Sequence, residues 1–323
     1  MMPAGPQVVV LGTLNTDISV VGVPRLPGSD EDAFGIRLAI TAGGKARNAA
    51  EMLARLLGAG SVSFIGRTVQ DPFGLWRVPY DALRSAGVDI RYVRVGGADG
   101  ETGAPAVALL VVDVDGRHSS TVNIEPASSL SEADIEAARL VFDQVSARRG
   151  LVAMSLEMPG PVARYAVRAA AEHSLRVVLD PGGWTESARY VPQFARDVFL
   201  IKPNALEARR LTGVEVSGFA SAEMVADRLR LHGIQNVLIT NGANGAYLFG
   251  RLREHIEIPV IKDGGQPDST GCGDQVMASL CALLCAGWDL ADAARLAIRA
   301  GTMQFYRMRV QPLSLAEIMA AMT

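Results

Sequence analysis

Short runs of β-branched and other apolar residues recur along the chain, and turn-forming residues bound each of them. Such runs are typical of parallel strands that are buried on both faces. Stretches with the helical spacing of apolar positions lie between most of these runs. Strands that alternate with helices predict an α/β fold, a doubly wound and mostly parallel sheet flanked by helices. The predicted strands are residues 8–11, 62–65, 151–155, 177–180, 198–201 and 237–240, and the predicted helices are residues 46–57, 161–173, 205–211 and 224–231.

Two regions interrupt this alternation. From residue 17 to 41 and from residue 92 to 123 the chain has extended segments with turns and no amphipathic helix between them. In the second region, Asp115-Gly116 within VVDVDGRHSS is a strong hairpin signal. We therefore expect a small β-sheet that forms a lid, built from about residues 13–42 and 92–125 of a single domain of residues 1–323.

The segment DPFGLWRVPYDALRSAG has the apolar spacing of a helix from Pro72 onward. Pro79 lacks the N–H that a helix bond needs, and it disfavours helical angles at Val78. We expect a kink or a break at this point.

Composition restricts the classes of function. With 323 residues, 49% of them hydrophobic, the chain can bury a sizeable core. A net charge of -3 gives no general reason to bind nucleic acid or a membrane surface. The N-terminal apolar run is too short for a signal peptide, and no segment approaches the roughly 18 to 20 apolar residues of a membrane span. Cys272, Cys281 and Cys285 match neither a zinc spacing nor a disulfide framework, so we expect a cytoplasmic protein.

The sequence PDSTGCGDQVMASLCALL places two glycines and an acid where an apolar helix begins. Gly271 and Gly273 can take backbone angles that let successive N–H groups converge on one point, and a helix start favours an anion. Asp274 lies in or beside the first helical turn. Taken alone, the glycines need only make a turn and Asp274 need only favour the helix dipole. An anion hole beside a carboxylate is also what phosphoryl transfer to an alcohol requires.

Two familiar phosphate-binding motifs are absent from the sequence. Gly44-Lys45 lacks the glycine and the hydroxyl residue of a Walker loop, because Ala39 and Ala46 occupy those places. No G-x-G-x-x-G follows the first strand, which argues against a Rossmann dehydrogenase. Lys45 is nevertheless informative, because the chain has only three lysines among its 31 basic residues.

Several other polar motifs have both a structural and a functional interpretation. Gly43-Gly44 can be a simple turn, with Asn48 a polar residue of the next helix. Asn204 and Glu207 are three residues apart, which suits either a helix N-cap or a magnesium site that acts through water. The sequence TNGANG can bring backbone close to a nucleotide, and it can equally join two strands of a hairpin.

The motif DSTGCGD resembles the D-T-x-G-A-G-D signature of the ribokinase-like, or PfkB, carbohydrate kinases. Five further elements occur in family order: VVVLGTLNTDISVVGVPRLPG, AGGKARNAAEMLARLLG, SLEMP, KPNALEARRLTG and LITNGANGAYLF. The resemblance implies an ATP-dependent kinase with Mg2+, in which Asp274 is the general base and the Gly271, Cys272 and Gly273 amides form the anion hole. The implied substrate-binding residues are Asn15, Asp17, Gly43, Gly44, Lys45, Asn48 and Glu157. The implied nucleotide-binding residues are Asn204, Thr240, Gly242, Asn244 and Gly245, with Asn204 and Glu207 on magnesium through water.

The acceptor that the resemblance implies is a hydroxymethyl group of ribose or a related unphosphorylated sugar. A nucleoside kinase of the same fold and a non-catalytic sugar or nucleotide sensor are the alternatives. Arg47 stands where the family has a small residue, which keeps a phosphosugar substrate open. Family members also form dimers, and the apolar Val107, Leu109, Leu110 and Val111 lead us to expect a homodimer through the lid.

In ribokinases a potassium ion lies near the residues that correspond to Asp268 and Thr270. Arg309 and Leu313 depart from the family pattern nearby, and the cation of Arg309 could replace the ion, so potassium activation stays open. Cys272 is a further departure, and a thiol at a helix start could be unusually acidic and easily oxidised.

Overall fold

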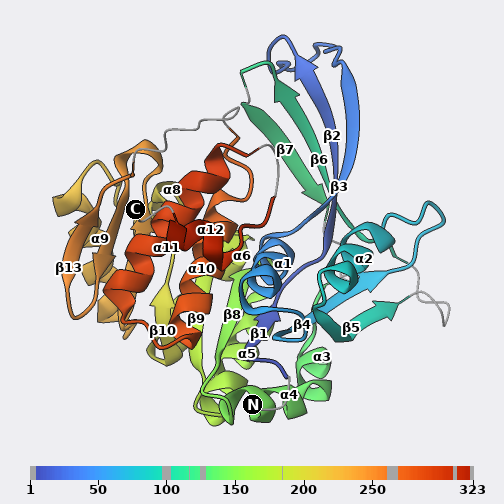
Figure 1. The fold of residues 1–323 in the computed structure, drawn as a ribbon. Helices are drawn as coiled ribbons and strands as arrows, with labels where there is room; N and C mark the ends of the chain where they lie inside the picture. Colours follow the sequence, from blue (N-terminus) through green and yellow to red (C-terminus); the bar gives the residue numbers. More distant parts are fainter. Residues whose placement is uncertain are drawn as a thin grey trace.

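The computed structural model describes residues 5–96, 103–115, 117–123, 129–183, 185–259, 268–307 and 311–320. Its large sheet consists of β1 (Val8–Leu11), β4 (Val62–Val69), β5 (Asp89–Gly96), β8 (Leu151–Leu156), β9 (Arg176–Gly183), β10 (Val198–Ile201), β11 (Asn236–Thr240), β12 (Ala246–Phe249) and β13 (Arg253–Ile256). The order across this nine-stranded sheet is β13-β12-β11-β10-β9-β8-β1-β4-β5 (Figure 1). Neighbouring strands from β11 to β5 in this order run parallel, and β12 and β13 extend the sheet antiparallel. The predicted doubly wound, mostly parallel sheet is confirmed.

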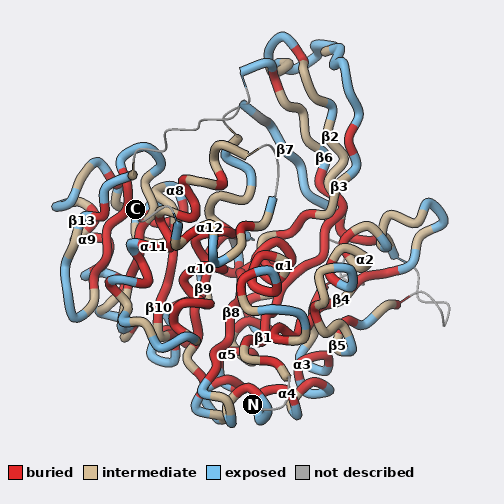
Figure 2. The backbone as a smooth tube through the Cα atoms, viewed as in Figure 1, coloured by how far each residue is buried: buried red, intermediate tan, exposed pale blue. Residues whose placement is uncertain are grey.

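Helices cover both faces of this sheet. Side chains alternate between the two faces along a strand, so Val8 and Val10 of β1 pack into one apolar core and Val9 and Leu11 into the other. The helices of the first core are α1 (Lys45–Leu57), α2 (Arg77–Ser85), α10 (Cys272–Cys285), α11 (Leu290–Phe305) and α12 (Leu315–Ala320). Those of the second are α3 (Glu132–Ala137), α4 (Arg139–Ser146), α5 (Gly160–Glu172), α7 (Val191–Phe194), α8 (Ala205–Thr212) and α9 (Phe219–Leu231), with the short α6 (Thr185–Ala188) beside them. The buried segments gather between these layers (Figure 2).

The small sheet is the predicted lid. It consists of β2 (Asn15–Val23), β3 (Arg37–Gly43), β6 (Ala106–Asp113) and β7 (His118–Asn123), in the order β3-β2-β6-β7. It stands out from the main body, and much of its tip is exposed (Figures 1 and 2). β6 and β7 pair antiparallel, which confirms the hairpin expected at Asp115-Gly116, although Gly116 lies outside the described residues.

Two sequence-based expectations were wrong in detail. The second segment of the lid does not begin near residue 92, because Tyr92 and its neighbours belong to β5, which pairs with β4 in the large sheet. This segment begins with β6 at Ala106. Charged Arg91 and Arg94 interrupt the apolar run of β5, which lies at the edge of the sheet. The helix expected from Pro72 starts only at Arg77, so Pro79 falls in its first turn, where an N–H bond is not needed.

Candidate active site

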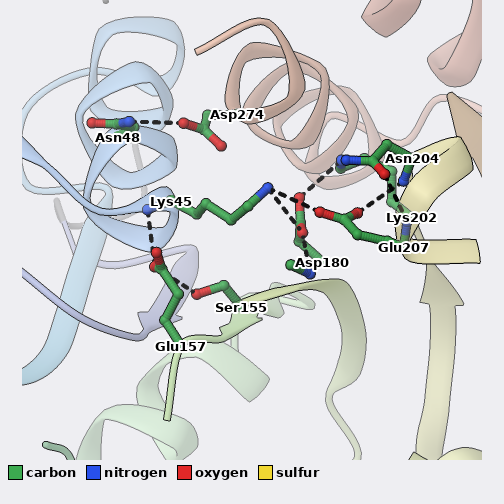
Figure 3. Close-up of polar contacts among 10 residues, drawn as sticks. Lys45, Asn48, Ser155, Glu157, Asp180, Lys202, Asn204, Glu207 and Asp274 are labelled. Carbon is green, nitrogen blue, oxygen red and sulfur yellow. Dashed lines mark hydrogen bonds and ion pairs between the residues drawn. The ribbon is translucent and has the colours of Figure 1, made fainter. Parts of the chain in front are cut away.

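The candidate site lies where the parallel strands β8, β9 and β10 end. Glu157 follows β8, Asp180 lies in the last part of β9, and Lys202 follows β10. Because the carboxyl ends of parallel strands meet at one edge of a sheet, these side chains come together there. The first turns of α1 and α10 reach the same edge and add Lys45 and Asp274 (Figure 3). The result is a cluster of charged side chains drawn from distant parts of the chain.

The glycine-rich turn forms the start of α10. Gly271 has a φ of 76°, a left-handed conformation that favours glycine, and the helix begins at Cys272. The first i to i−4 hydrogen bond of the helix runs from the Gln275 N–H to the Gly271 carbonyl, with a length of 2.8 Å. The Cys272 amide donates a long bond of 3.4 Å to the Ser269 carbonyl. The N–H groups of Gly273 and Asp274 come before this bond and have no acceptor within the helix, which makes this helix start suited to an anion.

Asp274 is buried in the first turn of α10 and faces α1. Its Oδ2 accepts a hydrogen bond of 2.7 Å from Asn48 Nδ2. Burial raises the pKa of Asp274 above its usual value, while Lys45 and the Asn48 hydrogen bond act in the opposite direction. A carboxylate with a raised pKa accepts a proton more readily, which is what a general base requires.

Lys45 links the two sides of the site. Its backbone N–H donates to Glu157 Oε2 at 2.9 Å, and its ammonium lies 3.4 Å from Asp180 Oδ1 and 3.5 Å from Glu207 Oε1 (Figure 3). Burial alone would lower the pKa of Lys45, but the carboxylates of Asp180 and Glu207 outweigh it and hold the pKa well above its usual range. Lys45 therefore stays charged, and its ammonium lies beside the N-x-x-E element.

Glu157 is a buried acid in this cluster. Burial raises its pKa to about 7, against the opposing effect of Lys45 and with a further increase from Asp274. Ser155 donates a hydrogen bond of 3.1 Å to Glu157 Oε2. This carboxyl can change its charge near neutral pH.

Asn204 and Glu207 form a capping box at the start of α8. Asn204 Oδ1 accepts from the Glu207 N–H, and Glu207 Oε2 accepts from the Asn204 N–H, both at 2.8 Å. The structural interpretation of this motif is therefore confirmed. The second carboxylate oxygen of Glu207 points to Lys45 and into the site.

Sequence reasoning missed Asp180 and Lys202 as site residues. Lys202 is 2% exposed, and its ammonium lies 2.9 Å from Asp180 Oδ2. Burial would raise the pKa of Asp180, but Lys202 and Lys45 hold it well below its usual value. A Cβ at Gly273 would lie 3.7 Å from the Lys202 ammonium, so this charge lies next to the start of α10. Two features of the sequence could have identified Asp180 and Lys202. Each lies at or just after the end of a predicted buried strand, and Lys202 is one of only three lysines in the chain.

The expected sugar-binding residues of the lid meet at its base. Asn15 is buried and pairs with Gly43 across β2 and β3. A Cβ at Gly43 would overlap the Asp17 carboxylate, and a Cβ at Gly44, where φ is 96°, would lie 2.7 Å from the Thr13 carbonyl. Neither position has room for a side chain, so both must be glycine for the chain to pack this closely. Burial raises the pKa of Asp17 to about 6, while Arg47 lowers it and Asp274 raises it.

Arg47 is fully buried instead of lining an open pocket. Its guanidinium contacts Glu51 Oε2 and Asn48 Oδ1, and it donates to the Ala42 carbonyl at 3.1 Å. Because these contacts with the protein engage both terminal nitrogens, Arg47 gives little support to a phosphosugar substrate.

The expected nucleotide loop joins β11 and β12. These strands pair antiparallel, so the hairpin interpretation is confirmed, and a short 3-10 helix at Gly242–Asn244 forms the turn. The Thr240 N–H donates to the Pro203 carbonyl at 3.0 Å, and a β-bridge joins Thr240 to Asn204. A Cβ at Gly245 would overlap the Ile256 carbonyl. The loop thus lies beside the N-x-x-E element.

The segment before α10 is held by local bonds. The Thr270 N–H donates to Asp268 Oδ1 at 2.8 Å, and the Asp268 N–H donates to the Phe305 carbonyl at the same distance. Leu313 is buried against α10, and Arg309, which bears on potassium activation, lies outside the described residues.

The structure does not favour the acidic thiol that the helix start allowed at Cys272. Burial, together with the nearby carboxylates of Asp268 and Asp274, raises the pKa of Cys272 to about 12. Desolvation and nearby negative charge therefore outweigh the lowering of the thiol pKa that a helix start produces, and the thiol stays protonated.

Neither a membrane-spanning helix nor a cluster of metal ligands occurs among the described residues. No helix in this part of the chain is long and apolar enough to cross a membrane. Over the same residues, no group of three or more His, Cys, Asp or Glu side chains has an arrangement that could hold a metal ion.

Comparison with known proteins agrees with this geometry. The family model of the pfkB family carbohydrate kinases matches residues 6–314. The chain is 26% identical over 304 residues to a ribokinase of Arabidopsis thaliana, covering 92% of this chain and 76% of that protein. The solved structure of Giardia lamblia ribokinase has a TM-score of 0.83 at 20% identity, with 98% of this chain and 99% of that one covered. The structure of Arabidopsis thaliana ribokinase complexed with ribose and ATP has a TM-score of 0.78 at 23% identity, with 98% of both chains covered.

The two structural likenesses establish the fold, which is ribokinase-like with its four-stranded lid. The family match spans almost the whole chain and includes every element of the site described above. The chain therefore belongs to the pfkB family of carbohydrate kinases and is a ribokinase-like phosphotransferase.

Proposed function

We propose that the protein transfers the γ-phosphoryl group of ATP to a hydroxymethyl group of ribose or a related unphosphorylated sugar. The observation that carries the proposal is the position of Asp274. It is a buried carboxylate in the first turn of α10, beside amides suited to an anion and within reach of two lysines. This combination supplies both a base for an alcohol and a place for the moving phosphoryl group.

In the proposed reaction, the oxygen of the sugar hydroxyl attacks the γ-phosphorus, and Asp274 accepts the proton of that hydroxyl. The bond from that phosphorus to the bridging oxygen of ATP breaks, and ADP leaves with the bonding electrons. The amides of Gly271, Cys272 and Gly273 stabilise the transferring group, with the Gly273 amide the better placed because Cys272 already donates to Ser269. The ammonium groups of Lys45 and Lys202 add fixed positive charge on the same side.

Asn204 and Glu207 would hold magnesium through bound water. The chemistry of this pair fits, because hydrated Mg2+ takes few direct protein ligands, and Glu207 turns a carboxylate oxygen into the site. When bound, the ion supplies charge neutralisation for the β- and γ-phosphates. The chain's own contribution is to orient Glu207, which the capping box with Asn204 does from one side and Lys45 from the other.

The nucleotide would lie along the β11–β12 hairpin. Thr240, Gly242, Asn244 and Gly245 form this turn, and the bridge from Thr240 to Asn204 places it next to the residues proposed for magnesium. At Gly242, space is open around the backbone, which allows the close approach of a ligand.

Potassium activation stays a separate prediction at Asp268 and Thr270.

The sugar would lie at the base of the lid. Asn15, Asp17 and Asn48 offer acceptors and donors for vicinal hydroxyls, and Glu157 lies across from them at the end of β8. Gly43 and Gly44 bring the backbone close to the same space. Closure of the lid would exclude water, which competes as an acceptor of the phosphoryl group.

The lid also supports the proposed homodimer. Leu38 and Ile40 of β3 are exposed, and the register across the sheet places them on one face with Val20 of β2 and Leu109 of β6. An apolar face of this kind is costly to leave in water. In sedimentation experiments, the wild type should have the mass of a dimer and L38D that of a monomer. A monomeric wild type would contradict the dimer, and a dimeric L38D would contradict the interface through the lid. A cytoplasmic location remains a prediction.

A panel of sugars, sugar phosphates and nucleosides tests the acceptor directly. In a coupled assay of ADP release, we expect turnover with ribose or a related free sugar and a far lower kcat/KM with the phosphorylated forms. A preference for nucleosides would select the nucleoside kinase instead. Absence of acceptor-dependent ADP release across the panel would contradict the proposed function.

A further inference from the structure

Arg47 is buried in the first turn of α1, with 1% of its surface exposed. An arginine in such a place needs partners that accept its hydrogen bonds. Those partners are Glu51 one turn later, the carbonyl of Ala42, and Asn48 Oδ1. The last contact connects Arg47 to the site, because the other end of the same amide donates to Asp274.

The contacts at the two ends of the Asn48 amide fix its orientation. A guanidinium has only N–H donors, so Asn48 must present its carbonyl oxygen to Arg47. Its NH2 group then faces Asp274, and the distance from Nδ2 to Oδ2 is 2.7 Å. If the amide turned over, its oxygen would face the carboxylate and its NH2 would face the guanidinium, so both contacts would be repulsive.

We propose that Arg47 is a positioning residue for phosphoryl transfer, which acts through Asn48 to hold the Asp274 carboxylate in its orientation toward the acceptor hydroxyl. This inference rests on the proposed function, in which Asp274 is the base. Glu51 anchors the other terminal nitrogen of Arg47, so the chain of contacts runs from Glu51 through Arg47 and Asn48 to Asp274.

Other charges also face Asp274, and the role of Arg47 differs from theirs. Lys45 of α1, Asp180 of β9 and Lys202 after β10 act on Asp274 through charge. The same holds for the titratable Asp17 of β2 and Glu157 after β8, whose pKa values Asp274 raises. Arg47 is not a direct partner of that carboxylate; it touches the amide that is. Its own charge instead lowers the pKa of Asp17 in the lid. Loss of Arg47 should therefore act on the Asp274 carboxylate mainly through Asn48, with a smaller effect through the changed charge of Asp17.

A double-mutant cycle of R47A and N48A tests this dependence, with saturating ATP and with ribose or whichever sugar of the panel gives turnover. We expect R47A to lower kcat by about tenfold or more, the usual effect of losing a hydrogen bond to a charged group. The acid limb of its pH profile should move to higher pH, because the amide no longer stabilises the Asp274 carboxylate. R55A, an exposed arginine of the same helix, is the matched control and should leave kcat unchanged.

The double variant gives the decisive comparison. In the N48A background, R47A should change kcat by less than about twofold, because residues that act as a unit are not additive. Methylguanidine should restore part of the kcat of R47A and none of that of the double variant. An equal loss of kcat in both backgrounds would overturn the inference. If R47A does not fold, R47M, which fills similar space but has no N–H donor for Asn48, replaces it in the cycle, and an unchanged kcat with an unchanged pH profile would overturn the inference as well.

D274N, measured alongside, separates this inference from the proposed function. If D274N keeps near-normal turnover, the proposed base is wrong, and the Arg47 inference fails with it. If D274N is inactive and the Arg47 effect is independent of Asn48, only the Arg47 inference fails.

Discussion

Asn48 Nδ2 donates a 2.7 Å hydrogen bond to Asp274 Oδ2, which joins the first turns of α1 and α10. The two helices pack against each other on the same face of the large sheet. The helix that carries the proposed base is thus held by the helix that follows the lid. This arrangement connects the acceptor side of the site to the phosphoryl side through one side chain.

Substitution of Gly43 by alanine should weaken sugar binding selectively. A Cβ at this position would overlap the Asp17 carboxylate, so Asp17 must move away from the space proposed for the sugar. We expect the KM for the sugar to rise by about tenfold, since small displacements of a binding group have effects of this size. The KM for ATP should change little. G218A is the matched control, because that glycine has extended backbone and open space around it.

Replacement of Lys202 by methionine should destabilise the fold. The ammonium is 2% exposed and lies 2.9 Å from Asp180, so its removal leaves a buried carboxylate with less compensation. We expect the free energy of unfolding to fall by about 3 kcal/mol, the usual cost of breaking a buried pair. The double variant K202M/D180N should recover part of that loss. Chemical denaturation measures both, and a change below about 0.5 kcal/mol for K202M would contradict the prediction.

Glu157 should make stability depend on pH. Its pKa rises from 4.5 to about 7 on folding, so the folded protein binds this proton more tightly than the unfolded chain does. Its contribution to stability is then complete below pH 4.5 and is lost as the pH rises through about 7. Relative to wild type, E157Q should therefore gain in Tm between about pH 5 and about pH 8. A constant difference in Tm over this range would contradict the raised pKa.

Much of the fold could be predicted from the sequence because its signals are local. The β-branched runs of β1 and β10 gave their bounds directly, since strands buried on both faces need continuous apolar residues. The end of β5, from residue 92, was assigned to the lid because no amphipathic helix separates it from the extended segments that follow. Only its pairing with β4 reveals the sheet to which it belongs.

The site was less predictable because its contacts join distant positions. Asp180 and Lys202 meet only when β9 and β10 lie side by side. Lys202 opens the element KPNALEARRLTG, but no pattern in the sequence connects it to Asp180. A helix start alone allows an acidic thiol at Cys272, but burial beside two carboxylates raises the pKa of that thiol instead. The partnership of Arg47 with Asn48 likewise needs side-chain geometry, because adjacent residues on a helix do not ordinarily face each other.

The central claim is that Asp274 is the general base, and D274N tests it most directly. Single-turnover measurement of phosphoryl transfer, combined with ATP binding by calorimetry, separates the chemical step from nucleotide affinity. Loss of a general base should lower the rate by about 100- to 10,000-fold, while ATP still binds. Phosphoryl transfer at a rate near that of wild type would contradict the assignment.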